Sequence, residues 1–174
     1  MDGEERRRKI IAILKESEQA IAGTELAGRL GVTRQVVVQD IALLRAGNKN
    51  ILSTNKGYLL YDAGSSAREC RRTMKVVHAN SRIREELYII VDNGGRTLDV
   101  VVEHPIYGQI TVDLFIRNRL DADNFVRAIQ ENQTRPLNGL TMGVHYHTIA
   151  AESEEILDRI EKKLEEQGFL LKND

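Results

Sequence analysis

The stretch GTELAGRLGVTRQVVVQDIALLR, residues 23–45, combines two short amphipathic helices with a tight turn between them. Thr24 is the expected N-cap of the first helix, because its hydroxyl can accept a hydrogen bond from a free backbone N–H. Gly31 is expected to end that helix, since the residue after a helix often adopts a positive φ that glycine tolerates. Thr33 then opens a second helix that runs to about Arg45. The pattern predicts a helix-turn-helix unit.

The second of these helices has two different faces. Val37, Ile41 and Leu44 recur at i, i+4 and i+7, so they form one stripe that is expected to face the core. Gln35 and Gln39 lie almost opposite this stripe. A glutamine side chain carries both a donor and an acceptor, which match an adenine edge in the major groove. The exposed face is therefore expected to read DNA, although solvated surface residues would give the same pattern.

Segments on either side complete the first domain. Residues 6–16 carry the apolar stripe of an amphipathic helix, and two apolar stretches within residues 51–61 flank a hairpin signal at residues 54–57. This succession of helices and a hairpin is the layout of a winged helix-turn-helix, which we place at residues 1–63. The residues expected to contact phosphates or base edges are Thr24, Thr33, Arg34, Gln35, Gln39 and Lys56.

Residues 63–66, Ala-Gly-Ser-Ser, are small and mark the boundary with a second domain at residues 68–174. Strands are predicted near residues 73–78, 97–103, 109–116, 143–149 and 169–171, and helices near residues 81–92, 121–131 and 152–167. Helices and strands mix without regular βαβ spacing, so we expect an α+β domain.

His145 and His147 are separated by one residue in a predicted strand. Alternate residues of a strand point to the same face, so the two imidazoles can bind one metal ion. A third histidine and a carboxylate from elsewhere would complete a site for zinc, nickel, iron or cobalt. Such a pair is more often exposed or hydrogen-bonded than ligating, so the pattern alone leaves both interpretations open.

His78 and Glu86, eight residues apart, are the candidates to complete this site. Asn80 and Ser81 are helix-cap residues, so His78 can end a strand while Glu86 lies two turns into the following helix. Glu86 flanks the apolar stripe of that helix, whereas Glu85 points to solvent. A carboxylate beside a core needs a partner, and a metal ion would supply one.

The bulk composition excludes some classes of protein. The chain has 174 residues, a formal net charge of -1 and a single cysteine, Cys70, which fits a reducing cytosol. No apolar run reaches the length of a membrane span, and the polar N-terminus lacks the core of a signal peptide. We expect a soluble cytoplasmic protein whose DNA contacts depend on locally placed side chains, because it has no global basic field.

Taken together, the motifs resemble the niacin-responsive repressors of NAD biosynthesis over nearly the whole chain. Residues 23–27 and 32–41 look like the winged helix of that family, and the second half looks like its three-histidine (3H) domain. The motifs that carry the second resemblance are His78 with Glu85-Glu86-Leu87, Asn93-Gly94-Gly95-Arg96, Val102-Glu103-His104-Pro105-Ile106-Tyr107-Gly108 and Gly143-Val144-His145-Tyr146-His147-Thr148-Ile149. Their shared order and compact spacing make the resemblance specific.

The resemblance implies a homodimeric repressor that binds operator DNA when nicotinic acid, its co-repressor, is bound. It also implies one divalent transition metal ion per chain (nickel, zinc or iron), held by His78, Glu86, His145 and His147. We expect nicotinic acid to dock at or beside the metal through its pyridine nitrogen or its carboxylate. Arg135 or Arg72 would pair with the carboxylate. His104, which lies in a distinctive family motif, is a candidate pocket residue and not a ligand.

Three alternatives are compatible with parts of this pattern. A metal sensor that ignores niacin would have the same metal ligands. A metalloenzyme would use an open position on the metal to activate water, but it lacks an obvious base beyond Glu85 or Glu103, and a DNA reader argues against it. A biotin-type repressor would need a ligase domain, for which the chain is too short. We therefore expect a regulator and not an enzyme.

Overall fold

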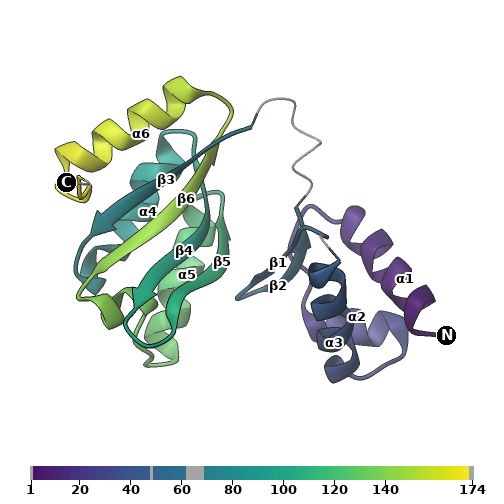
Figure 1. Ribbon diagram of the computed structural model, residues 1–174. Helices are drawn as coiled ribbons and strands as arrows, with labels where there is room; N and C mark the ends of the chain where they lie inside the picture. Colours follow the sequence, from purple (N-terminus) through teal and green to yellow (C-terminus); the bar gives the residue numbers. More distant parts are fainter. Residues whose placement is uncertain (1, 48, 62–68, 173–174) are drawn as a thin grey trace. The chain divides into compact units, whose positions relative to one another are not determined.

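The structure is a computed structural model that describes residues 2–47, 49–61 and 69–172. The chain forms two compact units, Met1–Ser66 and Ala67–Asp174 (Figure 1). Each has a hydrophobic core of its own. A helix-rich unit with a small hairpin precedes a unit of mixed helices and antiparallel strands. This arrangement confirms the α+β fold class. None of the helices in the described part of the chain has the length and hydrophobicity of a membrane span.

The first unit consists of three helices and a hairpin. Its elements are α1 (Gly3–Lys15), α2 (Gly23–Leu30), α3 (Arg34–Ala46), β1 (Ile51–Thr54) and β2 (Gly57–Leu60). The two strands pair antiparallel, and Ile21 makes a further bridge to Tyr58 of β2. The apolar stripes of the three helices meet in one core, with Ile10, Leu26, Val37 and Ile41 among its buried residues.

The ends of α2 and α3 agree with the sequence prediction at two points and differ at a third. Thr33 caps α3, since its hydroxyl accepts a hydrogen bond from the Val36 backbone N–H at 3.4 Å. Gly31 ends α2 with a φ of 66°. The prediction that Thr24 caps α2 is wrong, because the N-cap is Ala22. The helix starts earlier because its approach is fixed by paired backbone hydrogen bonds, at 2.8 Å each, between Ile21 and β2.

Asp40 anchors the third helix of this unit to the first. Its side chain is only 2% exposed, although it carries a charge, and it forms ion pairs with Arg6 and Arg7 of α1. Asp40 lies between the exposed Gln39 and the buried Ile41 on α3. The ion pairs therefore help to set the orientation in which α3 presents its exposed face.

Replacing Asp40 with alanine is expected to lower the free energy of unfolding of this unit by about 2–3 kcal/mol, because two arginines lose a buried partner. Urea denaturation of the full-length protein measures the change. Glu25→Ala is the matched control: it removes an exposed ion pair with Arg29 on α2, and it should cost less than about 0.5 kcal/mol. Equal effects of the two substitutions would contradict an anchoring role for Asp40.

The second unit is a four-stranded antiparallel sheet with helices against it. Its elements are β3 (Cys70–Val77), a 3-10 turn η1 (Asn80–Arg82), α4 (Ile83–Asp92), β4 (Arg96–His104), β5 (Gly108–Ile116), α5 (Arg119–Glu131), a 3-10 turn η2 (Leu137–Thr141), β6 (Val144–Ala151) and α6 (Glu154–Glu166). The strand order is β3-β6-β4-β5, so β6 and β4 are the two inner strands. The helices α6, α4 and α5 contact one another in that order and cover one face of the sheet (Figure 1).

Strand β4 contains a bulge. Against β6 it pairs Thr97 with Ile149 and then Val101 with Tyr146, so a step of four residues on β4 opposes a step of three on β6. Asp99 lies inside this irregular stretch, which is also irregular in the pairing of β4 with β5. A bulge releases backbone groups from the regular ladder and can redirect them to other partners.

Two local predictions in the second unit are wrong. Residues 169–171 do not form a strand, because only Leu170 bridges to β3, at Val76. Asn80 and Ser81 are not helix caps: they lie within the turn η1, whose N-cap is Ala79, while the N-cap of α4 is Arg82. The chain enters this turn under a tertiary constraint, since the His78 backbone N–H donates to the Gly143 carbonyl at 3.4 Å.

Candidate metal centre and adjoining cavity

Four buried polar side chains from three parts of the second unit meet beneath the sheet. His78 follows β3 directly, Glu86 lies on α4, and His145 and His147 lie on the inner strand β6. The alternation of β6 turns both of its histidines toward the helix-covered face, where α4 presents Glu86. The structure thus brings together the four residues for which a metal site was predicted.

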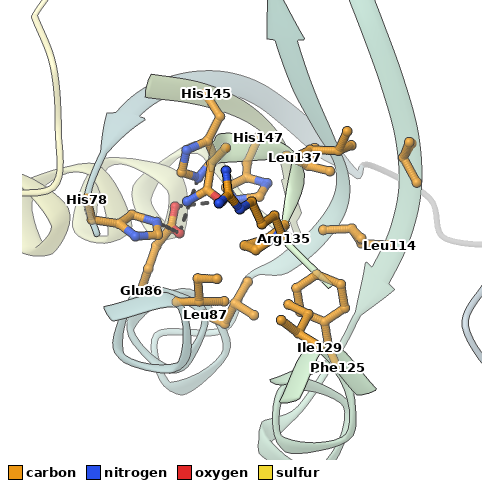
Figure 2. Close-up of a pocket in the computed structure, with 15 residues that line it drawn as sticks. His78, Glu86, Leu87, Leu114, Phe125, Ile129, Arg135, Leu137, His145 and His147 are labelled. Atoms are coloured by element: carbon orange, nitrogen blue, oxygen red, sulfur yellow. Dashed lines mark hydrogen bonds and ion pairs between the residues drawn. The ribbon is translucent and has the colours of Figure 1, made fainter. Parts of the chain in front are cut away.

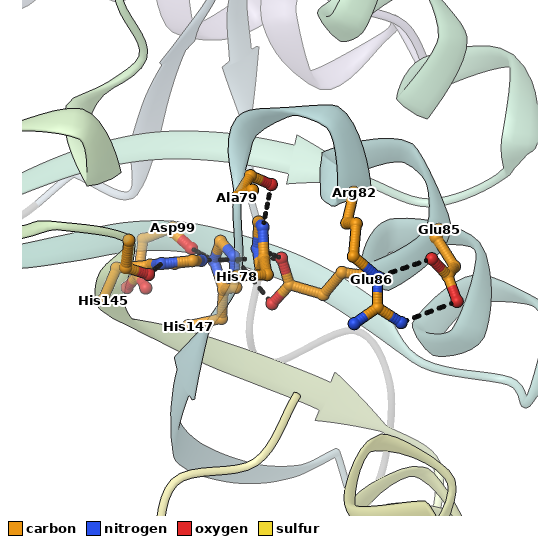
Figure 3. A network of polar contacts seen from close by, with 9 residues as sticks. His78, Ala79, Arg82, Glu85, Glu86, Asp99, His145 and His147 are labelled. Atoms are coloured by element: carbon orange, nitrogen blue, oxygen red, sulfur yellow. Dashed lines mark hydrogen bonds and ion pairs between the residues drawn. The ribbon is translucent and has the colours of Figure 1, made fainter. Parts of the chain in front are cut away.

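The carboxylate of Glu86 is the centre of this cluster (Figure 3). Its Oε2 atom lies 2.5 Å from His78 Nε2 and 3.5 Å from His145 Nε2, and its Oε1 atom lies 3.3 Å from His147 Nε2. Glu86 is only 1% exposed. All three histidines therefore direct the same ring nitrogen at one desolvated carboxylate.

The other ring nitrogen of each histidine contacts a backbone carbonyl. The Nδ1 atoms lie 2.8 Å from the Ala79 oxygen for His78, 2.8 Å from the Gly143 oxygen for His145, and 2.5 Å from the Asp99 oxygen for His147. A carbonyl oxygen only accepts, so each Nδ1 carries the proton and donates. In a neutral imidazole the Nε2 lone pair is then free to bind a metal ion.

This arrangement fits a divalent metal ion. A neutral Nε2 and an ionised carboxylate are both acceptors, so their close approach requires a cation or a proton between them. The Glu86 Oε1 atom is buried and makes no hydrogen bond of regular geometry among the described residues, although His147 Nε2 lies 3.3 Å from it. Ligand atoms of His78, Glu86 and His145 all lie within 4.8 Å of one another. Three imidazoles and one carboxylate suit zinc, nickel or iron.

The electrostatics of the cluster favour an ionised Glu86. Burial by itself would raise the pKa of Glu86, but the charge and hydrogen bonds of the histidines hold that pKa well below its usual range. Burial by itself would lower the pKa of His78 and of His147, but Glu86 raises both above their usual value. The carboxylate is therefore ionised and ready to bind a cation.

Neighbouring residues fall outside the cluster. Glu85 is half exposed and pairs with Arg82 at 2.9 Å, on the side of α4 away from the histidines (Figure 3). His104 ends β4 and uses its Nδ1 atom to accept hydrogen bonds from the Ile106 and Tyr107 backbone N–H groups, at 3.2 and 3.3 Å. These contacts make it a turn residue, and it does not line the cavity described below.

A cavity of about 330 Å³ adjoins the cluster (Figure 2). The four residues of the cluster form part of its wall. Most of the remaining wall is apolar, from Ile83, Leu87, Val100, Val112, Leu114, Phe125, Ile129, Pro136 and Leu137. Arg135 and Asn138 are the polar side chains among the other lining residues. A volume of this size is typical of sites for small molecules.

The two arginines predicted to bind an effector lie in different places. Arg135 lines the cavity, and no ion pair joins it to a carboxylate in the described part of the chain. Arg72, in contrast, does not reach the cavity. It forms ion pairs with three carboxylates of α6, from Glu154 at 2.8 Å, Asp158 at 2.8 Å and Glu161 at 2.6 Å. Its charge is already neutralised there, so the structure corrects its assignment to the effector.

The residues predicted to contact DNA lie on the surface of the first unit. Thr24, Thr33, Arg34, Gln35, Gln39 and Lys56 are all exposed. Val37 and Ile41 on the opposite side of α3 are buried. The two-faced character of α3 is therefore confirmed, and Gln35 and Gln39 are available to a partner.

The sequence analysis did not identify two residues that shape the site. Asp99 supplies the carbonyl that fixes His147, and Asn138 lines the cavity. No sequence signal marks the bulge that frees the Asp99 carbonyl. Asn138 precedes Gly139 in a segment typical of a turn, which hides its burial.

Comparisons with known proteins agree with this organisation. An HTH domain matches residues 6–59, and a 3H domain matches residues 71–173. The chain is 42% identical over 168 residues to a probable transcription repressor NiaR of Thermotoga maritima, covering 97% of this chain and 94% of the relative. It is 39% identical over 172 residues to the transcription repressor NadR of Bacillus subtilis, covering 98% and 96%.

The fold and the matched domains define a two-domain protein of the helix-turn-helix class, with a C-terminal 3H domain. More particularly, the chain belongs to the family of the NiaR and NadR repressors, because it is 42% and 39% identical to these two relatives over nearly its full length. Both relatives are named as transcription repressors, which favours a regulator over the metalloenzyme alternative.

Gly143 must remain a glycine for the cluster to form. Its φ is 89°, and a Cβ atom at this position would lie 2.4 Å from the His78 carbonyl oxygen. Gly143→Ala should therefore displace His78, abolish tight metal binding and lower the free energy of unfolding by about 2 kcal/mol or more. Competition with a chromophoric chelator measures the metal affinity.

Gly139→Ala is the control for this substitution, since the nearest neighbour of its Cβ would be Arg135 Cβ at 3.9 Å. That variant should bind metal like the wild type. Unchanged metal affinity of Gly143→Ala would show that the close approach to His78 is not needed.

Asp99 should control metal affinity without touching the metal. Its Oδ1 atom accepts a hydrogen bond from the Thr148 backbone N–H at 2.8 Å, which holds the bulge in place while its carbonyl orients His147. Asp99→Ala should lower metal affinity about 10- to 100-fold, the usual effect of losing a residue that orients a ligand. Asp99→Asn keeps an oxygen acceptor and should retain most of the affinity. Equal losses in the two variants would argue against this role.

Proposed function

We propose that this protein represses genes of NAD biosynthesis and niacin uptake, with nicotinic acid as co-repressor and one divalent metal ion bound in the 3H domain. The observation that carries the proposal is the cavity, because its wall combines the candidate metal cluster, apolar side chains and Arg135. The relatives of this chain are named as transcription repressors. The proposed ligand is a small planar ring with a carboxylate, and each part of it has a counterpart in this wall.

Different side chains of the cavity would bind the ring and the carboxylate of nicotinic acid. Phe125 and the aliphatic residues around it offer apolar surface to the pyridine ring. Arg135 offers a guanidinium with no ion-pair partner among the described residues, and such a group binds a carboxylate with two parallel hydrogen bonds.

The metal would be held by His78, Glu86, His145 and His147. When bound, it supplies a Lewis-acidic position that accepts a nitrogen or oxygen donor of the ligand. The protein contributes the rigid frame: three histidines held in one tautomer by backbone carbonyls, and one carboxylate that balances the charge. Because these contacts already orient every ligand, the site needs no large rearrangement to bind a metal ion.

The first unit would bind the operator as duplex DNA. Gln35 and Gln39 on α3 are exposed and suited to adenine edges, and Arg34 at the start of the helix can reach guanine or phosphate. Thr24, Thr33 and Lys56 are exposed at positions where phosphates are commonly contacted. We expect a homodimer in the cytoplasm, in which two copies of α3 read half-sites about 34 Å apart.

A second candidate is a metal sensor that does not respond to niacin. The completeness of the metal cluster favours it, because four protein ligands would bind a metal ion without any help from a small molecule. In that case metal alone would change the affinity for DNA. The two candidates differ only in whether the cavity beside the cluster binds an effector.

Fluorescence anisotropy with promoter DNA from the organism's own NAD-synthesis and niacin-transport genes separates these candidates. The titration is run with and without nicotinate, and each arm with and without a chelator. We expect nicotinate to tighten DNA binding and the chelator to abolish that effect. His145→Ala should lose the response to nicotinate. Arg135→Gln should raise the nicotinate concentration needed for half of the response at least tenfold.

His104→Ala serves as the control, because His104 lies outside the cavity and should leave the response to nicotinate intact. DNA binding that follows the metal and ignores nicotinate would establish the metal sensor instead. An unchanged nicotinate affinity of His145→Ala would refute docking at or beside the metal.

A further inference from the structure

Asn138 is a buried polar residue whose side chain lacks a partner. It lies in the turn η2, is only 4% exposed, and lines the same cavity as the metal cluster. Neither its Oδ1 nor its Nδ2 atom has a hydrogen-bond partner among the described residues. A buried amide without partners is unfavourable for folding, because both groups give up their hydrogen bonds to water. Its position therefore requires an explanation beyond packing.

The backbone of Asn138 is firmly held, so the unpaired amide is not a consequence of a loose turn. Its carbonyl oxygen accepts hydrogen bonds from the Gly143 backbone N–H at 2.8 Å and from the Thr141 hydroxyl at 3.3 Å. Gly143 in turn contacts His78 and His145 through its own carbonyl. The same short segment thus fixes both the metal cluster and the residue that carries the unpaired amide.

The cavity wall limits what can satisfy this amide. Outside the metal cluster, Arg135 and Asn138 are the only polar side chains among the lining residues described. Both come from one segment of four residues at the start of η2 and its approach. A ligand with a polar substituent on an apolar ring would place that substituent near these two side chains and its ring among the apolar ones.

We propose that Asn138 is a specificity-determining residue that hydrogen-bonds the acyl group of the ligand, next to the charge contact made by Arg135. The proposal rests on the function proposed above and names the feature of the ligand that the cavity reads. The Nδ2 group donates to an acyl oxygen. The Oδ1 atom faces either an amide N–H or the polarised C–H edge of the ring beside the acyl group.

The two side chains then read different properties of the ligand. Arg135 distinguishes a carboxylate from its neutral amide, because only the carboxylate forms an ion pair. Asn138 recognises an oxygen acceptor, which both the acid and the amide possess. A site built to hydrogen-bond a substituent strongly rejects analogues that lack it, because its buried polar groups are then left unpaired.

Two nearly isosteric substitutions test this assignment. Asn138→Leu removes both unpaired groups and should raise the melting temperature of the ligand-free, metal-free protein by about 2–4 °C, while lowering the affinity for nicotinate at least tenfold. Asn138→Asp replaces the donor with a carboxylate, which repels nicotinate but still accepts from an amide. Its preference should therefore shift toward nicotinamide.

The experiment is calorimetric titration of metal-loaded wild type, Asn138→Leu and Asn138→Asp with nicotinate and with nicotinamide, together with thermal denaturation without ligand. Weaker nicotinate binding by both variants, with a higher melting temperature for Asn138→Leu and a shifted preference for Asn138→Asp, supports the proposal. Tight nicotinate binding by the wild type and by Asn138→Leu alike would overturn it and leave the proposed function intact. A lower melting temperature of Asn138→Leu would also overturn it, since the amide would then have a structural partner. A wild type that does not bind nicotinate overturns both.

Discussion

The burial of the Glu86 carboxylate is the constraint on which the second unit depends. An ionised group that has left water must be compensated by nearby positive charge or by directed hydrogen bonds. Three histidines, one after β3 and two on β6, direct their Nε2 atoms at the carboxylate, so a proton or a metal ion held between these atoms supplies that charge. These contacts tie α4 to strand β6 of the sheet, in addition to the apolar packing of Ile83, Leu87 and Ile90.

Backbone carbonyls also take part in the arrangement around Glu86, because they orient the three histidines. Each histidine can point its Nε2 atom inward only because a carbonyl oxygen holds its Nδ1 atom, and these carbonyls come from three different kinds of local structure. Ala79 lies beside a 3-10 turn, Gly143 has a positive φ, and Asp99 lies in a bulge. The irregular places of the fold are thus the places that serve the site, which is a common relation between local irregularity and function.

Local patterns predicted the parts of the protein that depend on periodicity. The alternation of a strand placed His145 and His147 on one face, the helical period separated Glu86 from Glu85, and the stripe on α3 separated its core side from its exposed side. Features that depend on distant contacts were not predictable. The start of α2 is set by the bridge between Ile21 and Tyr58 of β2. The charge of Arg72 is neutralised by carboxylates of α6, and the Asp99 carbonyl is freed by an irregular strand pairing. The amide of Asn138 is buried by tertiary packing that no turn signal reveals.

The bulge in β4 links the pairing of this strand to the position of the proton on His147. Beyond the extra residue, Val100 and Val102 are buried on the helix-covered face, while Val101 contributes to the open face. Loss of a single residue between Thr97 and Val101 would make the step of β4 equal to that of β6, but it would widen the mismatch with β5, where Thr97 pairs with Ile116 and Asp99 with Asp113. It would also withdraw the carbonyl that fixes the proton of His147. We therefore expect insertion or deletion of one residue in this part of β4 to disturb the metal cluster more than an exchange of exposed side chains does.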